Sequence, residues 1–171
     1  MVHSFPTRRS SDLPEFFYFV HNANGDDPIA AINAETHGSV GASALGAGFT
    51  PAKPGDLLTL FGTGFGTTNP PFGPGVLPGE AAQVTGSVSI TFGGIKLAPS
   101  DILYVGVTQN AGLYQVNLRV PANVPNGDQS VVITIGGASS PAGGYITVDN
   151  PANSIAAGSW AIDSPAGDIG L

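Results

Sequence analysis

The chain has 171 residues, and its 5 Lys and Arg against 12 Asp and Glu give a formal net charge of −7. So few basic side chains neutralise few phosphates, which argues against a nucleic-acid partner, and no apolar run approaches the roughly 20 residues that a membrane span needs. Without cysteine the chain has no disulfide and no thiolate nucleophile, while 25 Gly and 15 Pro among many Val, Ile and Thr favour an all-β protein of short strands and turns.

The first thirteen residues differ from the rest of the chain. They hold Arg8 and Arg9, two of its three Arg, and residues 3–13 read as the in-frame translation of a common sequencing adapter. We therefore treat 1–13 as artefactual or disordered, and we expect the true N-terminus, with any signal peptide, to be missing. A native disordered terminus and a basic signal-peptide region are the alternatives.

Residues 14–50 are predicted to form lead-in strands that end in a loop rich in Gly, Ala and Ser. The segments 16–20 and 29–35 are apolar enough for two strands, and the Asn, Asp, Gly and Pro residues of 22–28 signal a turn between them. The sequence then predicts, in chain order, a loop at 38–48, a strand at 57–61, a Gly-rich strand end at 62–66 and a Pro/Gly loop at 69–78.

Period-two alternation is clearest in the second half of the chain. In 84–92 and in 113–120 apolar residues alternate with polar ones, which is typical of strands with one buried face and one face in water. Further strands are predicted at 102–107, 131–135 and 144–148. About eight strands at this spacing predict an antiparallel β-sandwich over 51–148, followed by a polar tail at 149–171.

Four oxygen-bearing side chains lie within six positions, at Asn22, Asn24, Asp26 and Asp27. Calcium binds such clusters, so these residues are candidate metal ligands. Their spacing is not that of an EF-hand loop, and no glutamate follows at the bidentate position. The alternative is a turn that the Asn and Asp side chains stabilise.

Nucleophilic and acid–base groups do not form a recognisable catalytic pattern. His21 and His37 are sixteen residues apart, each near acidic side chains, but nothing in the spacing enforces a shared site. Ser43 lacks the second glycine of a G-x-S-x-G elbow. The glycines of 62–66 do not open a helix, as a dinucleotide-binding loop would require. We therefore expect a protein that is not an enzyme and has no cofactor.

Aromatic side chains in loop-like sequence are candidate ligand platforms. Phe65, Phe72 and Trp160 lie in such stretches, and exposed rings can stack on sugars. The alternative is that these rings close the ends of the sandwich.

The strand segments carry a family resemblance. A Gly-rich G-x-G-F-G stretch ends the first long strand, and Gly-Leu-Tyr-Gln-Val-Asn at 112–117 is the most specific string. With the segments 54–66, 88–94, 112–121, 131–137 and 139–140, the chain resembles the uncharacterised Solibacter-type C-terminal domain of large bacterial secreted or surface proteins. It is also similar to the IPT/TIG group of immunoglobulin-like domains.

The resemblance implies an immunoglobulin-like module outside the cytoplasm, without catalytic residues, at the C-terminal end of a larger exported bacterial protein. Its partners would be upstream domains of that protein, or an extracellular protein or glycan. Three functions remain open: a structural or interaction module, a module that binds carbohydrate or another ligand, and an accessory fragment of a secreted enzyme.

Overall fold

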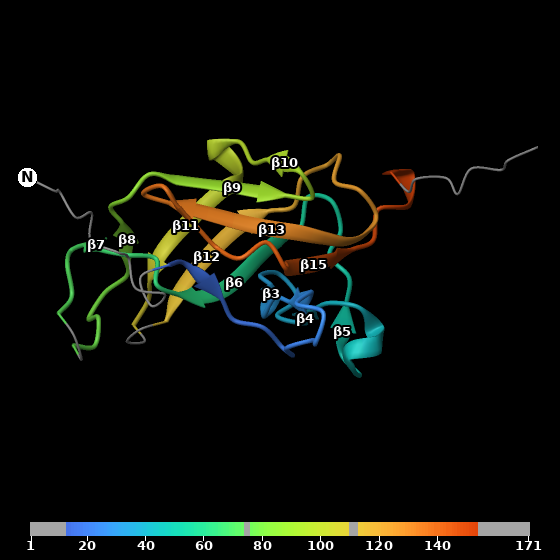
Figure 1. The fold of residues 1–171 in the computed structure, drawn as a ribbon, viewed down its shortest axis with the longest axis horizontal. Coiled ribbons are helices and arrows are strands. Elements are labelled where there is room, and N and C mark those ends of the chain that lie inside the picture. The colour runs from blue at the N-terminus through green and yellow to red at the C-terminus, as the bar shows by residue number, and fades with distance from the viewer. Residues whose placement is uncertain (1–12, 74–75, 110–112, 154–171) are drawn as a thin grey trace, which may run out of the picture.

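The computed structural model describes residues 13–73, 76–109 and 113–153, and this part of the chain is all-β (Figure 1). Its described helices are single 3-10 turns of three residues: η2 (Ser43–Leu45), η3 (Pro99–Asp101) and η4 (Pro151–Asn153). None of them has the length or the apolar character to cross a membrane.

The first sheet has nine strands in the order β5-β4-β3-β6-β12-β11-β8-β7, and β1 also pairs with β6. Its members are β1 (Glu15–Phe16), β3 (Ala31–Asn33), β4 (Ser39–Val40), β5 (Phe49–Thr50), β6 (Leu57–Thr63), β7 (Thr68–Asn69), β8 (Ala82–Val84), β11 (Ile102–Val107) and β12 (Tyr114–Arg119). The sheet is mixed, because β4 and β5 pair in parallel and the other pairs are antiparallel.

The second sheet has six strands in the order β10-β9-β13-β15-β2, and β14 pairs with β13. Its members are β2 (Asp27–Pro28), β9 (Val88–Phe92), β10 (Ile95–Lys96), β13 (Gly127–Ile135), β14 (Ala138–Ser139) and β15 (Gly144–Val148). It is mixed as well, since β2 and β15 pair in parallel. In Figure 1, β9 and β13 cross over β11 and β12 of the first sheet.

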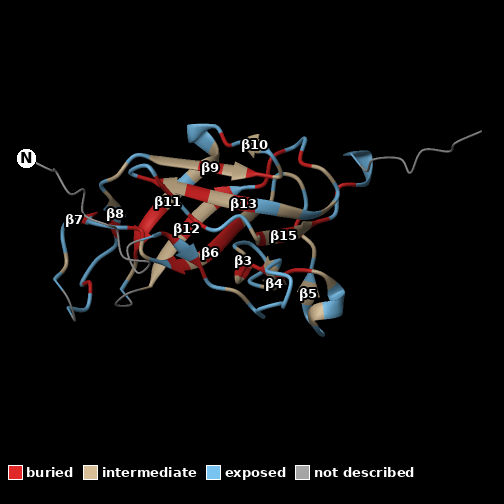
Figure 2. Ribbon diagram, viewed as in Figure 1, coloured by how far each residue is buried: buried red, intermediate tan, exposed pale blue. Residues whose placement is uncertain are grey.

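Both sheets bury one face in a single hydrophobic core (Figure 2). The alternation predicted from the sequence is confirmed: Val116 and Leu118 of β12 and Ile133 of β13 are 0% exposed, whereas their neighbours along each strand are half-buried or exposed. Burial of such side chains contributes about 1.5–3 kcal/mol each. The apolar faces of the two sheets thus account for the packing of the fold.

The lead-in residues belong to the same core as the strands that follow. β1 and β3 both pair with β6, and β2 pairs with β15, so residues before 50 extend both sheets. Phe16 and Ile29 are at most 1% exposed.

The start of the predicted tail is fixed to the core in the same way. The side-chain amide of Asn150, a buried residue, donates a hydrogen bond to the Val124 carbonyl at 2.6 Å.

Some segments predicted as loops contain short strands. β4 and η2 lie within 38–48, and Asn69 of β7 opens the segment 69–78. β4 pairs with only one residue of β3, and β7 with two of β8. Such brief pairing arises where a connecting segment runs beside an existing strand, and it leaves little periodicity in the sequence.

Truncation of Ile133 tests the shared core. Ile133→Ala is expected to lower the free energy of unfolding by about 2–5 kcal/mol, because it removes buried methyl groups and leaves a cavity between the sheets. Urea unfolding followed by circular dichroism measures the change. Val132→Ala is the matched control, since Val132 is half-buried on the opposite face of the same strand, and its loss should be smaller. Equal losses would contradict the assignment of faces.

Candidate functional site

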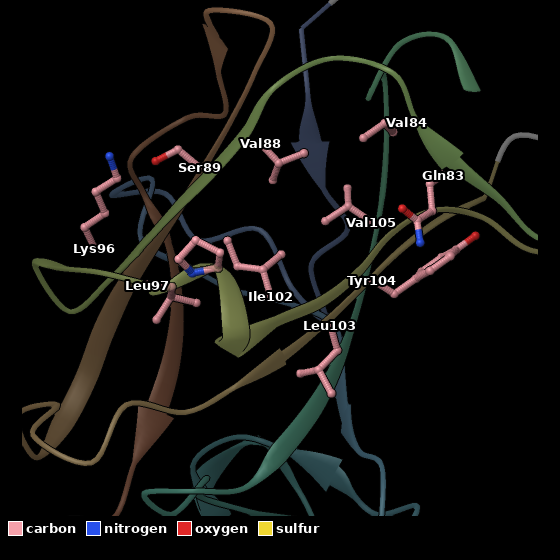
Figure 3. Close-up of a pocket in the computed structure, with 11 residues that line it drawn as sticks. Gln83, Val84, Val88, Ser89, Lys96, Leu97, Ile102, Leu103, Tyr104 and Val105 are labelled. Carbon is pink, nitrogen blue, oxygen red and sulfur yellow. The ribbon is translucent and has the colours of Figure 1, made fainter. Parts of the chain in front are cut away.

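A groove opens where β8 and β11 of the first sheet face β9 and β10 of the second (Figure 3). Its volume of about 490 Å3 falls within the roughly 300–1,000 Å3 of typical ligand pockets. Its walls are mainly aliphatic: Val84, Val88, Leu97, Ile102, Leu103 and Val105. The other lining residues are Gln83, Ser89, Lys96, Pro99 and Tyr104. An apolar surface with few polar groups is the usual composition of a binding site.

The groove exists because β8 covers only one end of β11. β8 pairs with Gly106 and Val107, and no described strand pairs with the outer side of Leu103–Val105. A Cβ atom at Gly106 would lie 2.1 Å from the Ala82 carbonyl oxygen, so the close approach of β8 requires glycine there. Beyond this crossing, Leu103 and Tyr104 have no strand of the described residues on their outer side, and a sheet edge of this kind can pair with another chain.

The opposite wall is a second sheet edge. β10 pairs with Thr91 and Phe92 of β9, and the Leu97 amide donates to the Ile90 carbonyl at 2.9 Å. On this side of β9, Val88 and Ser89 pair with no strand of the described residues. Two open edges from different sheets therefore face one apolar groove.

Leu103 is the extra residue of a β-bulge in β11. Ile102 pairs with Leu118 and Tyr104 pairs with Asn117, so Leu103 has no partner residue of its own in β12. A bulge changes the direction of the inserted side chain. Leu103 is 48% exposed and lines the groove.

Two polar side chains set the electrostatics of the groove. The Tyr104 hydroxyl donates to the Val107 carbonyl at 2.5 Å, and partial burial raises the pKa of Tyr104 above 10.0, so this hydroxyl is neutral at pH 7. Lys96 is exposed, and no carboxylate of a described residue lies within 4.0 Å of its ammonium group. Arg119, by contrast, has Asp101 at 3.9 Å. Lys96 pairs with Thr91 on the face of the second sheet opposite to the buried Ile90 and Phe92, so its charge lies at the rim of the groove.

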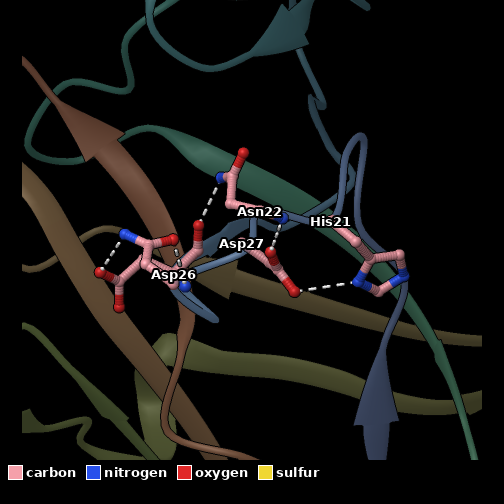
Figure 4. Close-up of polar contacts among 5 residues, drawn as sticks. His21, Asn22, Asp26 and Asp27 are labelled. Carbon is pink, nitrogen blue, oxygen red and sulfur yellow. Dashed lines mark hydrogen bonds and ion pairs between the residues drawn. The ribbon is translucent and has the colours of Figure 1, made fainter.

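A turn that its own side chains hold together contains the four calcium candidates (Figure 4). The Asp27 carboxylate accepts a hydrogen bond from the Asn22 backbone amide at 2.6 Å and lies 2.9 Å from His21 Nδ1. The Asn22 side-chain amide donates to the Asp26 carbonyl at 2.5 Å, and that of Asn24 donates to the Asp26 carboxylate at 2.9 Å.

These contacts favour the Asx-turn interpretation of residues 22–27. They lower the pKa of Asp27, chiefly through the hydrogen bond from the Asn22 backbone amide and then through the bond with His21. In the part of the chain that the structure describes, no three His, Asp or Glu side chains are placed to share a metal ion. The calcium interpretation gains no support from this geometry.

Phe65 is a core residue, so the prediction that it offers its ring to a ligand is wrong. It is 1% exposed and packs edge-on against Phe16, with 6.1 Å between ring centroids. Its ring also lies 5.2 Å from that of Tyr114. A Cβ atom at Gly62 would lie 2.8 Å from the Phe65 ring, so Gly62 gives Phe65 room to fold back onto β6. The alternative interpretation, in which the Phe65 ring closes an end of the sandwich, agrees with its place in the core.

The remaining candidate residues do not converge with Phe65. Phe72 is half-buried in the connection between β7 and β8, and Trp160 lies outside the described residues. His21 packs edge-on against Tyr18, with 5.2 Å between ring centroids. His37 occupies the turn between β3 and β4 with a φ of 60°.

The sequence predicts none of the groove residues as candidates. The alternation in 84–92 does place Val84 and Val88 on one face, but it also predicts that this face is covered by the other sheet. Whether it is covered depends on how far β8 extends along β11. The early end of β8 at Val84 carries no motif that signals an open edge.

Replacing Phe65 and Phe72 in turn by alanine tests which of the two rings is buried in the core. Phe65→Ala is expected to lower the free energy of unfolding by about 3–5 kcal/mol, because a fully buried ring is removed. Phe72→Ala, at a half-buried loop position, should cost less. Chemical denaturation of both variants measures the difference. A Phe65→Ala variant as stable as Phe72→Ala would show that Phe65 is not buried.

Asp27→Asn tests the hydrogen-bonded turn through its pH dependence. The folded protein lowers the pKa of Asp27 below its ordinary 3.8, so the ionised carboxylate stabilises the fold above that pH. This stabilisation is lost as the pH falls through the lowered pKa. Melting temperatures of the wild type and Asp27→Asn should therefore differ at pH 7 and approach each other as the pH falls from 3.8 through the lowered pKa of Asp27. Asp149→Asn, at an exposed acid outside the turn, is the control. A difference that persists unchanged in acid would contradict this role.

Comparison of the chain with protein-family models, with curated proteins and with solved structures finds no match.

Proposed function

We propose that the chain is a non-catalytic, immunoglobulin-like β-sandwich module that binds a protein partner through the groove between β8/β11 and β9/β10. Its two sheets enclose one hydrophobic core, and most of its strand pairs are antiparallel, as such a sandwich requires. The sequence resemblance at 54–66 and 112–121 adds that it is the C-terminal part of a larger exported bacterial protein. Upstream domains of that protein, or another extracellular protein, are then its partners.

The observation that carries the binding role is the pair of open sheet edges on one apolar groove. Proteins usually cover their sheet edges, or make them short or charged, because an open edge pairs with other chains. Here the outer sides of Leu103–Tyr104 and Val88–Ser89 have no described strand paired with them, and aliphatic side chains line the space between. Such a surface is suited to a partner that brings backbone hydrogen bonds and apolar side chains.

A carbohydrate ligand has less support. Sugar sites use exposed aromatic rings, but among the described residues that line the groove only Tyr104 is aromatic, and its hydroxyl donates a hydrogen bond to the Val107 carbonyl. Phe65 is buried. An accessory role beside a catalytic domain agrees with the proposal, since such modules bind partners or substrates without reacting with them.

Leu103→Arg tests whether the groove is the binding surface. Selection from a displayed library of random peptides should yield binders to the wild-type chain, and the variant should lose them because the long cationic side chain enters the groove mouth. Leu77→Arg is the matched control: Leu77 is 70% exposed, against 48% for Leu103, and does not line the groove. Both substitutions should change stability by less than about 0.5 kcal/mol.

The outcomes of this selection are distinct. Binders lost only with Leu103→Arg support the proposal. Binders retained by both variants place the binding surface elsewhere, and enrichment of no peptide, together with retention on a panel of polysaccharides, favours the carbohydrate alternative.

A further inference from the structure

We propose that the outer face of the first sheet binds an extended, neutral, β-linked polysaccharide, which lies across the strands on a row of aromatic and amide side chains. This surface is separate from the groove, and its ligand is a second one beside the protein partner. In order across the sheet, the row contains Gln83 of β8, Tyr104 of β11, Gln115 of β12, Phe61 of β6 and Phe17, which directly follows β1.

Strand register places these side chains in one line. Gly106 of β11 pairs with Gln83 on one side and with Gln115 on the other, and Gln115 pairs in turn with Phe61. The Phe17 backbone amide donates to the Phe61 carbonyl at 2.9 Å, so Phe17 continues the line beyond β6.

The row faces away from the hydrophobic core. Successive side chains of a strand point to opposite faces of its sheet. Leu60 and Val116, which neighbour Phe61 and Gln115 in their strands, are 0% exposed members of the core. Phe61 and Gln115 therefore project from the other face, where both are half-buried, and Phe17 is 41% exposed.

The absence of a side chain at Gly106 lets the Tyr104 ring lie along the sheet. A Cβ atom at Gly106 would lie 2.7 Å from the Tyr104 hydroxyl oxygen, and this hydroxyl donates to the Val107 carbonyl at 2.5 Å. The ring therefore runs along β11 with one face toward the sheet and the other outward, and Figure 3 shows it beside Gln83. Sugars stack their C–H groups on aromatic faces of this kind.

Amide groups next to the rings are held in place for sugar hydroxyls. Asn117 Oδ1 accepts hydrogen bonds from Gln115 Nε2 at 2.7 Å and from the Thr59 hydroxyl at 3.1 Å. Among the described residues, no group accepts from Asn117 Nδ2 and none donates to Gln115 Oε1. A fixed donor and acceptor side by side match neighbouring sugar hydroxyls, each of which can donate and accept.

The spacing of the row defines the linkage of the ligand. Adjacent strands lie about 4.7–4.9 Å apart, so β11 and β6, with β12 between them, are about 9–10 Å apart. One unit of an extended β-1,4-linked chain is about as long as one strand spacing. Alternate units would therefore meet the Tyr104 and Phe61 rings, and the unit between them would meet Gln115. An α-1,4-linked chain coils and leaves such a straight row.

Charge and backbone pairing favour a neutral glycan over other polymers. Every residue of the row is uncharged, and the formal net charge of −7 disfavours nucleic acids and acidic polysaccharides. A peptide strand finds no open edge here, because β12 pairs with β6 on one side and with β11 on the other. An uncharged chain of hydroxyl groups meets neither obstacle.

The test uses the full 171-residue chain, labelled with 15N, and the β-1,4-linked glucose hexamer cellohexaose. On titration, the side-chain amide signals of Gln115 and Asn117 should shift, whereas the backbone signals of Val88 and Leu103 in the groove should not. Maltohexaose, the α-1,4-linked isomer, should give no shift at the same concentrations.

Substitutions identify which side chains hold the glycan. Gln115→Leu should weaken cellohexaose binding about three- to tenfold, because it removes hydrogen bonds and nearly preserves the side-chain volume. Gln129→Leu is the matched control: Gln129 is a half-buried glutamine of β13 in the second sheet, and its replacement should leave the affinity unchanged. Phe17→Ala, which removes an exposed ring, should weaken binding about twofold or more. Circular dichroism checks that each variant is folded.

Three results would overturn the inference: no shift at millimolar cellohexaose, equal shifts with maltohexaose, or equal affinities of the Gln115→Leu and Gln129→Leu variants. Shifts confined to Val88 and Leu103 would also overturn it and would assign the sugar to the groove. The peptide selection with Leu103→Arg reports on the groove alone, so the proposed function stands or falls separately from this inference.

Discussion

The packing of one apolar face from each sheet into a common core is the constraint on which the rest of the structure depends. Leu58 and Leu60 of β6 and Val116 of β12 meet Ile90 of β9 and Ile133 of β13 in one cluster, and all are 0% exposed. Every other contact is an addition to this frame: the lead-in strands extend it, and Asn150 fixes the chain that leaves it. The groove lies where β8 and β11 of the first sheet face β9 and β10 of the second, and no further described strand covers the edges there.

Two glycines decide how the backbone departs from this regular frame. At Gly62 the Glu15 carbonyl oxygen and the Phe65 ring would both lie within 3 Å of a Cβ atom, so β1 and Phe65 can close one end of the core only over a glycine. A Cβ atom at Gly106 would likewise lie within 3 Å of the Ala82 carbonyl oxygen, so β8 can approach β11 there only because the residue is glycine. The first close approach seals an edge of β6. The second covers the end of β11, while no described strand pairs with Leu103 and Tyr104 on that side.

The sequence predicts the frame well and the groove poorly, for a physical reason. Alternation reports which side chains of one strand share a face, so the buried positions of β12 and β13 follow from it. It does not report where a neighbouring strand stops, and the open edge depends on the end of β8 at Val84. The sequence wrongly predicts an exposed ring at Phe65 for a similar reason. Its glycine neighbours signal a turn, but the return of its ring onto Gly62 is a tertiary contact.

An edge that binds a partner must also avoid indiscriminate pairing, and the same features serve both needs. A bulge and a lysine are two of the devices by which proteins protect sheet edges from aggregation. The bulge at Leu103 interrupts the register along β11, and Lys96 places a charge beside the apolar walls. A flat strand of another chain would therefore meet a broken ladder at Leu103. A segment that adapts its backbone to the bulge avoids this cost, so the edge selects among strands.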